Sequence, residues 1–200
     1  MKIRIYKMTH ATGFAPNYDC GILTLATCKP GIREKAEIGE WIAGFTSTSK
    51  TAGGTPRGQE RLIYLMKVTD KITFDKYWKK YPRKRPEYSE LGDNIYFLEG
   101  IVYKQTDKAK YHTDKEERDK DLLSDKVLIS TEFKYFGKEN PLDISEYREY
   151  IKIPYGVSRW GYESSNDKVA EFIEFVMKQE AKSDIDYSTI SIKKANSCSK

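Results

Sequence analysis

The segment Arg61-Leu62-Ile63-Tyr64-Leu65-Met66-Lys67-Val68 decides the fold of this 200-residue chain. It is nearly continuous in apolar residues, a pattern typical of a strand in the middle of a sheet. Upstream, charged and apolar residues alternate in Lys2–Met8, which predicts a strand with one buried face. The chain therefore begins to build a sheet from its first residues.

Other segments complete a set of short strands and helices. Further strands are predicted over Gly21–Cys28, Ile38–Phe45, Asn94–Val102 and Val127–Phe136. Two short helices are predicted, one that starts at Pro30 and one that is capped by the hydroxyl of Thr73. One longer amphipathic helix is predicted over Asp167–Ala181. Because strands and helices do not alternate regularly, we predict an α+β fold, either a mixed, partly closed β-sheet or a small β-barrel.

Length and composition indicate one domain with a core of its own. We expect a single domain over residues 1–182 and a polar, flexible tail over 183–200. Residues 104–121 hold six basic and six acidic side chains, and we expect a charged surface excursion there. No window is apolar enough for a membrane span or a signal peptide, which predicts a cytoplasmic protein that does not contact membranes.

An ordered set of motifs carries a resemblance to a known family. The motifs are Thr12-Gly13-Phe14-Ala15-Pro16-Asn17, Leu23-Thr24-Leu25-Ala26-Thr27-Cys28-Lys29-Pro30, Gly39-Glu40-Trp41-Ile42-Ala43-Gly44, Arg61–Met66, Thr73–Trp78, Gly92–Tyr96 and Phe133–Gly137. Together they resemble the second family of nucleotide-modification-associated domains. The resemblance implies a role in the hypermodification or handling of DNA bases in phages and bacteria, including defence systems.

The Gly-Glu-Trp-Ile-Ala-Gly element is also similar to a strand of PUA-like, EVE-like and ASCH-like barrels. These barrels bind nucleic acids and modified bases, so the resemblance implies a small PUA-like barrel. It is an analogy of fold and does not establish an activity.

The first candidate site is a loop followed by two cations and a thiol. Phe14 and Asn17 lie in the flexible loop, and Cys28, Lys29 and Arg33 follow it. The cations are suited to a phosphate, and the thiol to nucleophilic catalysis. The alternative is that Phe14 pins the loop to the core and that both cations lie on the surface.

The second candidate is the polar turn before the strand at Asn94. Asp93 could act as a general base, and the amide of Asn94 could read the edge of a base beside Tyr96. An ordinary turn explains the same residues equally well.

Aromatic and basic side chains suggest two further contacts with nucleic acid. Trp41, Tyr64 and Tyr96, with Trp78, could line a pocket in which a base stacks, although aromatic residues in strands more often form the core. The basic residues Lys79, Lys80, Arg83, Lys84 and Arg85 lie among tyrosines and are the best candidates for contacts with a nucleic-acid backbone. A solubilising loop is the alternative.

Histidine and cysteine positions do not predict a metal site. His10 and His112 are the only histidines, and with three scattered cysteines they make no paired ligand spacing. A dyad of Cys28 with His10 would require the fold to bring them together. The sequence indicates no particular cofactor.

Three functions follow from these observations. The first is recognition or processing of modified nucleotides or bases, with a nucleotide or modified DNA as partner. The second is a nucleotide group-transfer or hydrolytic enzyme that uses Asp93 or Cys28. The third is a non-catalytic subunit that binds protein partners of a modification complex.

Overall fold

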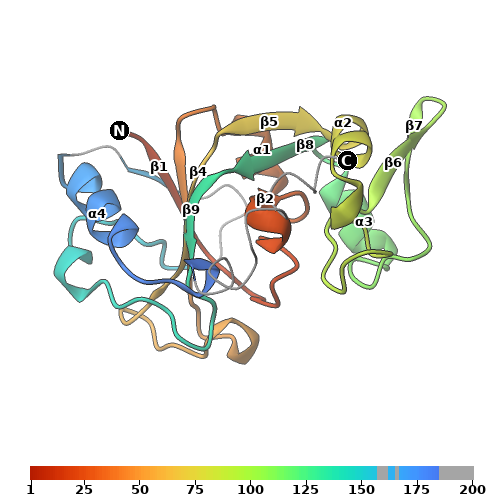
Figure 1. The fold of residues 1–200 in the computed structure, drawn as a ribbon. Coiled ribbons are helices and arrows are strands. Elements are labelled where there is room, and N and C mark those ends of the chain that lie inside the picture. The colour runs from red at the N-terminus through yellow and green to blue at the C-terminus, as the bar shows by residue number, and fades with distance from the viewer. Residues whose placement is uncertain (157–161, 165–166, 185–200) are drawn as a thin grey trace.

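A mixed sheet of five strands forms the centre of the molecule (Figure 1). The computed structural model describes residues 1–156, 162–164 and 167–184. Across the described sheet the strands follow the order β10 (Tyr162–Ser164), β1 (Ile3–Lys7), β3 (Trp41–Phe45), β4 (Leu62–Lys67) and β9 (Glu132–Tyr135). β1 and β3 are parallel and the other neighbours are antiparallel, so the sheet is mixed as predicted.

A bent pair of strands connects this sheet to a second one. β4 and β9 continue, after a short break, into β5 (Asp70–Thr73) and β8 (Lys126–Ser130), which are paired with each other. β2 (Leu23–Leu25) pairs with the other edge of β8 and completes the second sheet. Residues on β2 are thereby held beside the bent pair.

The remaining elements gather around the second sheet. α1 (Pro30–Lys35) follows β2, and α2 (Phe74–Lys80) follows β5, with the Thr73 hydroxyl accepting the predicted capping bond from the Lys76 amide. β6 (Tyr96–Glu99) and β7 (Val102–Gln105) form a hairpin that projects away from the central sheet, near α3 (Lys115–Asp121) (Figure 1). Short 3₁₀ turns lie at Asp19–Gly21, Lys50–Ala52, Pro82–Lys84 and Ser145–Tyr147.

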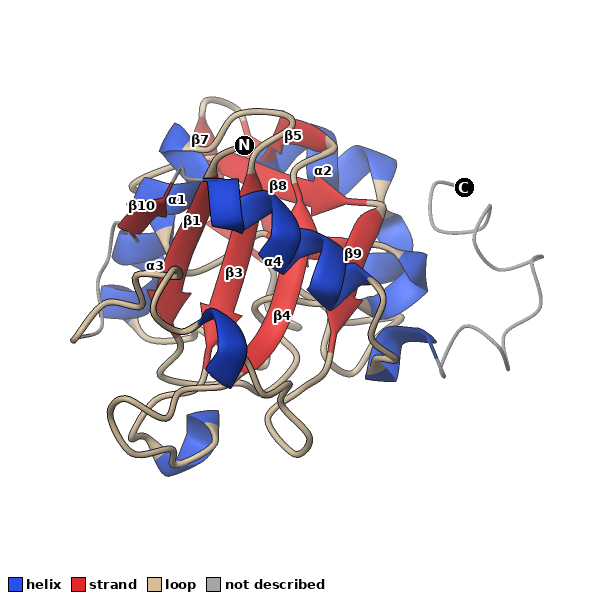
Figure 2. Ribbon diagram, turned by 90° about the vertical axis from the view of Figure 1, so that its left-hand side faces the viewer, coloured by secondary structure: helices blue, strands red, loops and turns tan. Residues whose placement is uncertain are grey.

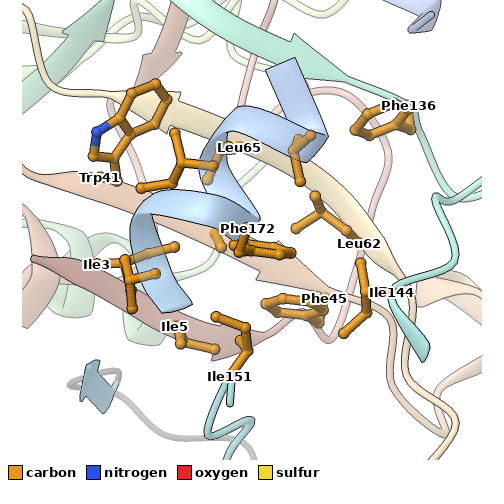
Figure 3. Packing of buried hydrophobic residues seen from close by; sticks show 14 of the residues in the cluster. Ile3, Ile5, Trp41, Phe45, Leu62, Leu65, Phe136, Ile144, Ile151 and Phe172 are labelled. Atoms are coloured by element: carbon orange, nitrogen blue, oxygen red, sulfur yellow. The ribbon is translucent and has the colours of Figure 1, made fainter. Parts of the chain in front are cut away.

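One face of the central sheet is covered by α4 (Asp167–Met177), the long helix that the sequence predicts (Figure 2). Its buried residues Val169, Phe172, Ile173 and Val176 pack on strand residues that include Ile3, Ile5 and Phe45 (Figure 3). The opposite face packs against β2 and α1 through a separate apolar cluster. The two faces of the central sheet are therefore each covered by an apolar cluster, and a third cluster, which includes Phe14, Phe74 and Tyr77, lies apart from both.

These sheets confirm the predicted α+β fold, but they do not form the small β-barrel that was one of the two predicted arrangements. In the described part of the chain the sheets do not close on themselves. No helix there combines the length and the apolar character that crossing a membrane requires.

Two of the predicted strands are broken in the structure. The segment Asn94–Val102 forms the β6–β7 hairpin, because Gly100 adopts a φ of 62° and turns the chain back. Val127–Phe136 is interrupted at Thr131, where the bent pair passes from one sheet to the other. Periodicity alone does not reveal a turn or bend inside an apolar run.

The alternation in β1 does not leave one face exposed. All five residues of β1 are buried, including Arg4 and Lys7. Arg4 forms an ion pair with Glu40, and Lys7 with Glu60 at 2.5 Å. Buried cations are tolerated here because each has a carboxylate partner.

Candidate functional site

Cys28 occupies a strained turn between β2 and α1. Cys28 and the following Lys29 both adopt left-handed backbone conformations, with φ of 58° and 37°. Such conformations are uncommon for residues with a side chain, and they are concentrated at functional sites. Cys28 is a free thiol and is partly exposed, so a small reagent can reach it.

A chain of hydrogen bonds runs from the thiol to a buried carboxylate. The Cys28 Sγ atom lies 3.4 Å from Nε2 of His112, and Nδ1 of His112 lies 2.6 Å from Oδ2 of Asp121. The side chain of Asp121 is 1% exposed, at the end of α3. A nucleophile, a base and a carboxylate that orients the base are thus arranged in order.

Asp121 also fixes the backbone and the neighbouring strand. Its Oδ1 accepts a bond of 2.7 Å from the Cys28 amide, and its Oδ2 accepts one of 3.0 Å from the hydroxyl of Tyr96. These bonds join the β2–α1 turn, β6 and α3 around one carboxylate. The site is therefore built into the fold.

Arg33 holds the same turn from within α1. This fully buried side chain donates to the carbonyl oxygens of Cys28, Ser124, Lys126 and Asp121, at 2.6 to 2.8 Å. Its donors are directed to the backbone, and no phosphate can approach it in this conformation. Arg33 consequently positions Cys28, and the predicted phosphate contact at Arg33 does not agree with its burial.

The surroundings of His112 favour its charged form. Burial lowers the pKa of His112, but hydrogen bonds to Asp121 and Cys28, together with the charges of these groups, raise it to about 10. The ring lies directly beside the thiol of Cys28.

The same three groups match two chemical arrangements. Ligand atoms of Cys28, His112 and Asp121 all lie within 4.8 Å of one another, a grouping that could hold a metal ion. Cys28 and Asp121 contact different nitrogens of the imidazole ring, which is also the order of a nucleophile, a base and an orienting carboxylate.

Aromatic rings and a lysine surround the thiol. The ring of Phe14 lies against the imidazole of His112, with centroids 5.3 Å apart. Lys29 places its ammonium 4.7 Å from the ring centroid of Tyr6, and the hydroxyl of Tyr6 bonds to that of Tyr64 at 2.8 Å. Phe14, predicted as a ligand contact, is 3% exposed and packs beside the imidazole.

Two cavities flank this region. A cavity of about 790 Å³ is lined by the stacked rings of Tyr18 and Tyr135, and its size suits a nucleotide. Burial raises the pKa of the Tyr6 and Tyr64 hydroxyls. The charges of Cys28 and Tyr135 raise the same two pKa values further, which places both residues near Tyr6 and Tyr64. A smaller cavity of about 520 Å³ is lined by Tyr96, Gln105 and Thr113.

Comparison with known proteins assigns the chain to a family. The family model described as nucleotide modification associated domain 2 matches residues 1–189. The chain belongs to this family. No curated protein and no solved structure matches the chain.

In this nucleotide modification associated domain, Asp93 and Asn94 are buried and structural. Asp93 is 1% exposed and accepts bonds from Thr24 and Tyr77 at 2.5 and 2.7 Å. Burial raises the pKa of Asp93 to about 6, although Lys84 and these bonds lower it. Asn94 donates to carbonyls of Tyr77 and Tyr81. Neither side chain is exposed to a ligand in this conformation. Their burial does not agree with the predictions that Asp93 acts as a general base and that Asn94 reads the edge of a nucleobase.

The predicted stacking aromatics and Asn17 lie in the interior of the domain. Trp41 faces α4 within the core (Figure 3). Tyr64 is fully buried, and Tyr96 is 2% exposed and bonds to Asp121. Asn17 bonds to the carbonyl of Leu91 and fixes the loop. Tyr96 lines the smaller of the two cavities described above.

The basic cluster of the domain is divided between surface and interior. Lys84 is fully buried and donates to carbonyls of the loop around Asn17, and Arg85 lies over the ring of Trp78 at 3.9 Å. Lys79 and Lys80 are exposed and pair with Asp75 and Asp70, and Arg83 is exposed. Of the five predicted cations, these last three are exposed.

Sequence reasoning paired Cys28 with the wrong histidine and missed Asp121. His10 is exposed and bonds to Thr51, whereas His112 lies beside Cys28. Most residues of the charged run at 104–121 are exposed, but His112 and Asp121 turn inward. The sequence did offer one signal for this pair, because the segment 104–121 contains a histidine together with several aspartates.

The predicted tail lies mostly outside the described residues. Only Ser183 and Asp184 of residues 183–200 are described, and both are fixed. Ser183 bonds to the Tyr135 amide, and Asp184 pairs with Lys134. These two residues therefore contact the strand β9.

Proposed function

We propose that this domain processes modified nucleotides or DNA bases by covalent catalysis at Cys28. The observation that carries the proposal is the hydrogen-bonded series Cys28, His112 and Asp121. Membership of the nucleotide modification associated family supports the nucleotide as substrate class. A DNA-modification or defence system of a phage or bacterium is the proposed setting.

The reaction begins with attack by the thiolate. Cys28 Sγ forms a bond to an electrophilic carbon of the substrate, such as the carbonyl of an acyl group, and His112 donates its proton to the departing nitrogen or oxygen. Asp121 keeps the imidazole in the required orientation. Water or an acceptor nucleophile then releases the group from sulfur, and His112 takes up the proton of that nucleophile.

The test is the capture of a covalent intermediate. The protein is mixed with nucleotides and oligonucleotides that carry amide-bearing or ester-bearing bases, quenched in acid and analysed by peptide mass spectrometry. We expect a substrate-derived mass on the peptide that contains Cys28, absent from Cys28→Ala. Turnover by Cys28→Ala at the wild-type rate would contradict covalent catalysis.

A second candidate is recognition without turnover, which the larger cavity favours. Tyr18 is partly exposed and lines that cavity, so a base could stack on its ring. Binding of a modified nucleotide that is weakened by Tyr18→Ala and unchanged in Cys28→Ala, without any product, would favour this candidate.

Exposed cations supply a further proposed contact if the substrate is DNA. Lys79, Lys80 and Arg83 would bind the phosphate backbone, although two of them have carboxylate partners. Replacing all three by glutamine should weaken binding to DNA and reduce its dependence on salt. Unchanged salt dependence would remove this contact.

A further inference from the structure

The thiol of Cys28 and the imidazole of His112 are separated by the distance that a tetrahedral metal ion requires. Their Sγ and Nε2 atoms lie 3.4 Å apart. Zn²⁺ binds a sulfur at about 2.3 Å and an imidazole nitrogen at about 2.0 Å, so two such ligand atoms at a tetrahedral angle lie about 3.5 Å from each other. The separation of the two side chains is therefore already that of a metal-bound pair.

Asp121 supports this arrangement from the other side of the ring. Its Oδ2 lies 2.6 Å from Nδ1 of His112, and its Oδ1 accepts the Cys28 amide at 2.7 Å. A histidine that binds a metal through one nitrogen usually donates the proton of the other to a carboxylate, which fixes the orientation of the ring. Asp121 also lies within 4.8 Å of the other two ligand atoms, but both its oxygens already accept hydrogen bonds. We therefore take it as the partner that orients His112.

Both ligands are held in place and can be reached from solvent. Arg33 donates to the carbonyl of Cys28 at 2.8 Å and Asp121 accepts its amide, so the backbone of the turn is fixed on both sides of the thiol. Cys28 is partly exposed, and the side chain of His112 is 14% exposed. Two protein ligands leave the other coordination positions of an ion to water or to an atom of a substrate.

We propose that Cys28 and His112 bind a thiophilic divalent cation of the Zn²⁺ class, and that this cation blocks the reaction at Cys28. Thiolate and imidazole ligands select Zn²⁺ over Mg²⁺ and Ca²⁺, which prefer oxygen. Binding releases the protons of Sγ and Nε2 to water and engages the electron pair of each atom. Sγ can then no longer attack a carbon, and Nε2 can no longer carry a proton. The blocking role rests on the proposed function, whereas the metal site does not.

Cd²⁺ is a spectroscopic probe for the site, because a bond between Cd²⁺ and a thiolate absorbs in the ultraviolet. The metal-free protein is titrated with Cd²⁺, and the signal that Cys28→Ala lacks is assigned to Cys28. We expect the affinity for Cd²⁺ to fall by about tenfold or more in His112→Ala, which loses a ligand. His10→Ala is the matched control, since His10 is exposed and bonds to Thr51. A signal that is identical in the wild type and Cys28→Ala, or an affinity unchanged in His112→Ala, would overturn the site.

Histidine NMR makes the same test without a substitution at the site, so it decides if His112→Ala does not fold. His10 and His112 are the only histidines of the chain, and His10→Gln identifies which imidazole signals belong to which residue. Addition of Zn²⁺ to the wild type should shift the signals of His112 and leave those of His10 in place. A shift of neither residue, or of His10 alone, would overturn the site.

Protection from alkylation tests the blocking role. The rate of reaction of Cys28 with iodoacetamide is measured by peptide mass spectrometry in metal-free protein, with a small excess of Zn²⁺, with Mg²⁺, and with EDTA added after Zn²⁺. We expect Zn²⁺ to slow the reaction by about tenfold or more, EDTA to restore it, and Mg²⁺ to leave it unchanged. A rate that Zn²⁺ does not change would overturn the blocking role.

The metal site and the proposed reaction can fail separately. Binding of Cd²⁺ at Cys28, without any covalent intermediate in the metal-free protein, would support the site and contradict the proposed function. An intermediate that forms equally well with and without Zn²⁺ would contradict the blocking role. Turnover that requires Zn²⁺ would also overturn the blocking role, because the ion would then take part in the reaction.

Discussion

Asp121 is the residue on which the geometry around Cys28 depends. One oxygen accepts from the Cys28 amide, and the other from His112 and Tyr96. An amide in its place would direct two N–H donors toward groups that are themselves donors. A carboxylate at this position is therefore required both for the turn and for the charge on His112.

Asp121→Asn should destabilise the protein and slow the reaction of Cys28. We expect a loss of about 1 to 3 kcal/mol in the free energy of unfolding, because buried donors lose their acceptor. Chemical denaturation measures the loss. Asp119→Asn is the control, since Asp119 lies on the same helix with its side chain 60% exposed. Equal stability of the two variants would show that the Asp121 bonds contribute little.

The raised pKa of His112 predicts a specific pH dependence of stability. Its folded-state pKa is about 10, against about 6.5 in the unfolded chain. The stabilisation is complete below pH 6.5 and is lost as the pH rises through 10. The gap in unfolding free energy between wild type and His112→Gln should therefore shrink from pH 6 to pH 10, by roughly 4 kcal/mol.

His10→Gln is the control for this titration, because His10 is exposed. Its gap from the wild type should stay nearly constant with pH. A gap for His112→Gln that is constant, or that grows with pH, would show that His112 is not held as a cation by Asp121.

At single residues the sequence did not show which of the predicted cations are buried. Arg33 and Lys84 were candidates for phosphate, yet both are buried and bond to backbone carbonyls. A long basic side chain can bind either a phosphate or the backbone carbonyls of its own chain. Which of the two it binds depends on the carbonyls that the fold leaves without other hydrogen-bond donors. That information is absent from the local sequence.

The element β3 is shaped by a close approach between its Gly44 and Tyr64 of β4. A Cβ atom on Gly44 would lie 2.2 Å from the Tyr64 ring, which is fully buried and bonded to Tyr6. Real Cβ atoms do not approach so closely, so the ring or the strand must move. Glycine is required here by packing.

Gly44→Ala should cost about 1 to 3 kcal/mol of unfolding free energy, as overpacking in a core does. Gly156→Ala is the matched control, since no atom of the described residues lies within 4 Å of a Cβ atom built there. Thermal or urea denaturation of both variants measures the difference. Equal stability would mean that Tyr64 has room to shift.

At the level of elements, local patterns were sufficient where the chain forms one uninterrupted element. β4, β3, α1, α2 and α4 all lie at or near their predicted positions. The bend at Thr131 and the turn at Gly100 were missed, because each lies inside an apolar segment whose direction is decided by its partners.

At the scale of the whole molecule, the site is assembled from segments that the sequence separates. His112 is 84 residues from Cys28, and Asp121 is 93 residues from it. The bent pair of strands brings β2 beside β8, and α1 then lies beside the segment that leads into β8. Local patterns predicted the fold class, but contacts over such separations depend on topology and could not be read from them.

The central claim is that His112 and Asp121 activate Cys28 as a nucleophile. The most direct test is the second-order rate of alkylation of Cys28 by iodoacetamide at neutral pH, in the wild type, His112→Ala and the control His10→Ala. We expect the wild type and His10→Ala to react at nearly the same rate, and His112→Ala to be about tenfold slower or more. Identical rates in all three proteins would contradict the account.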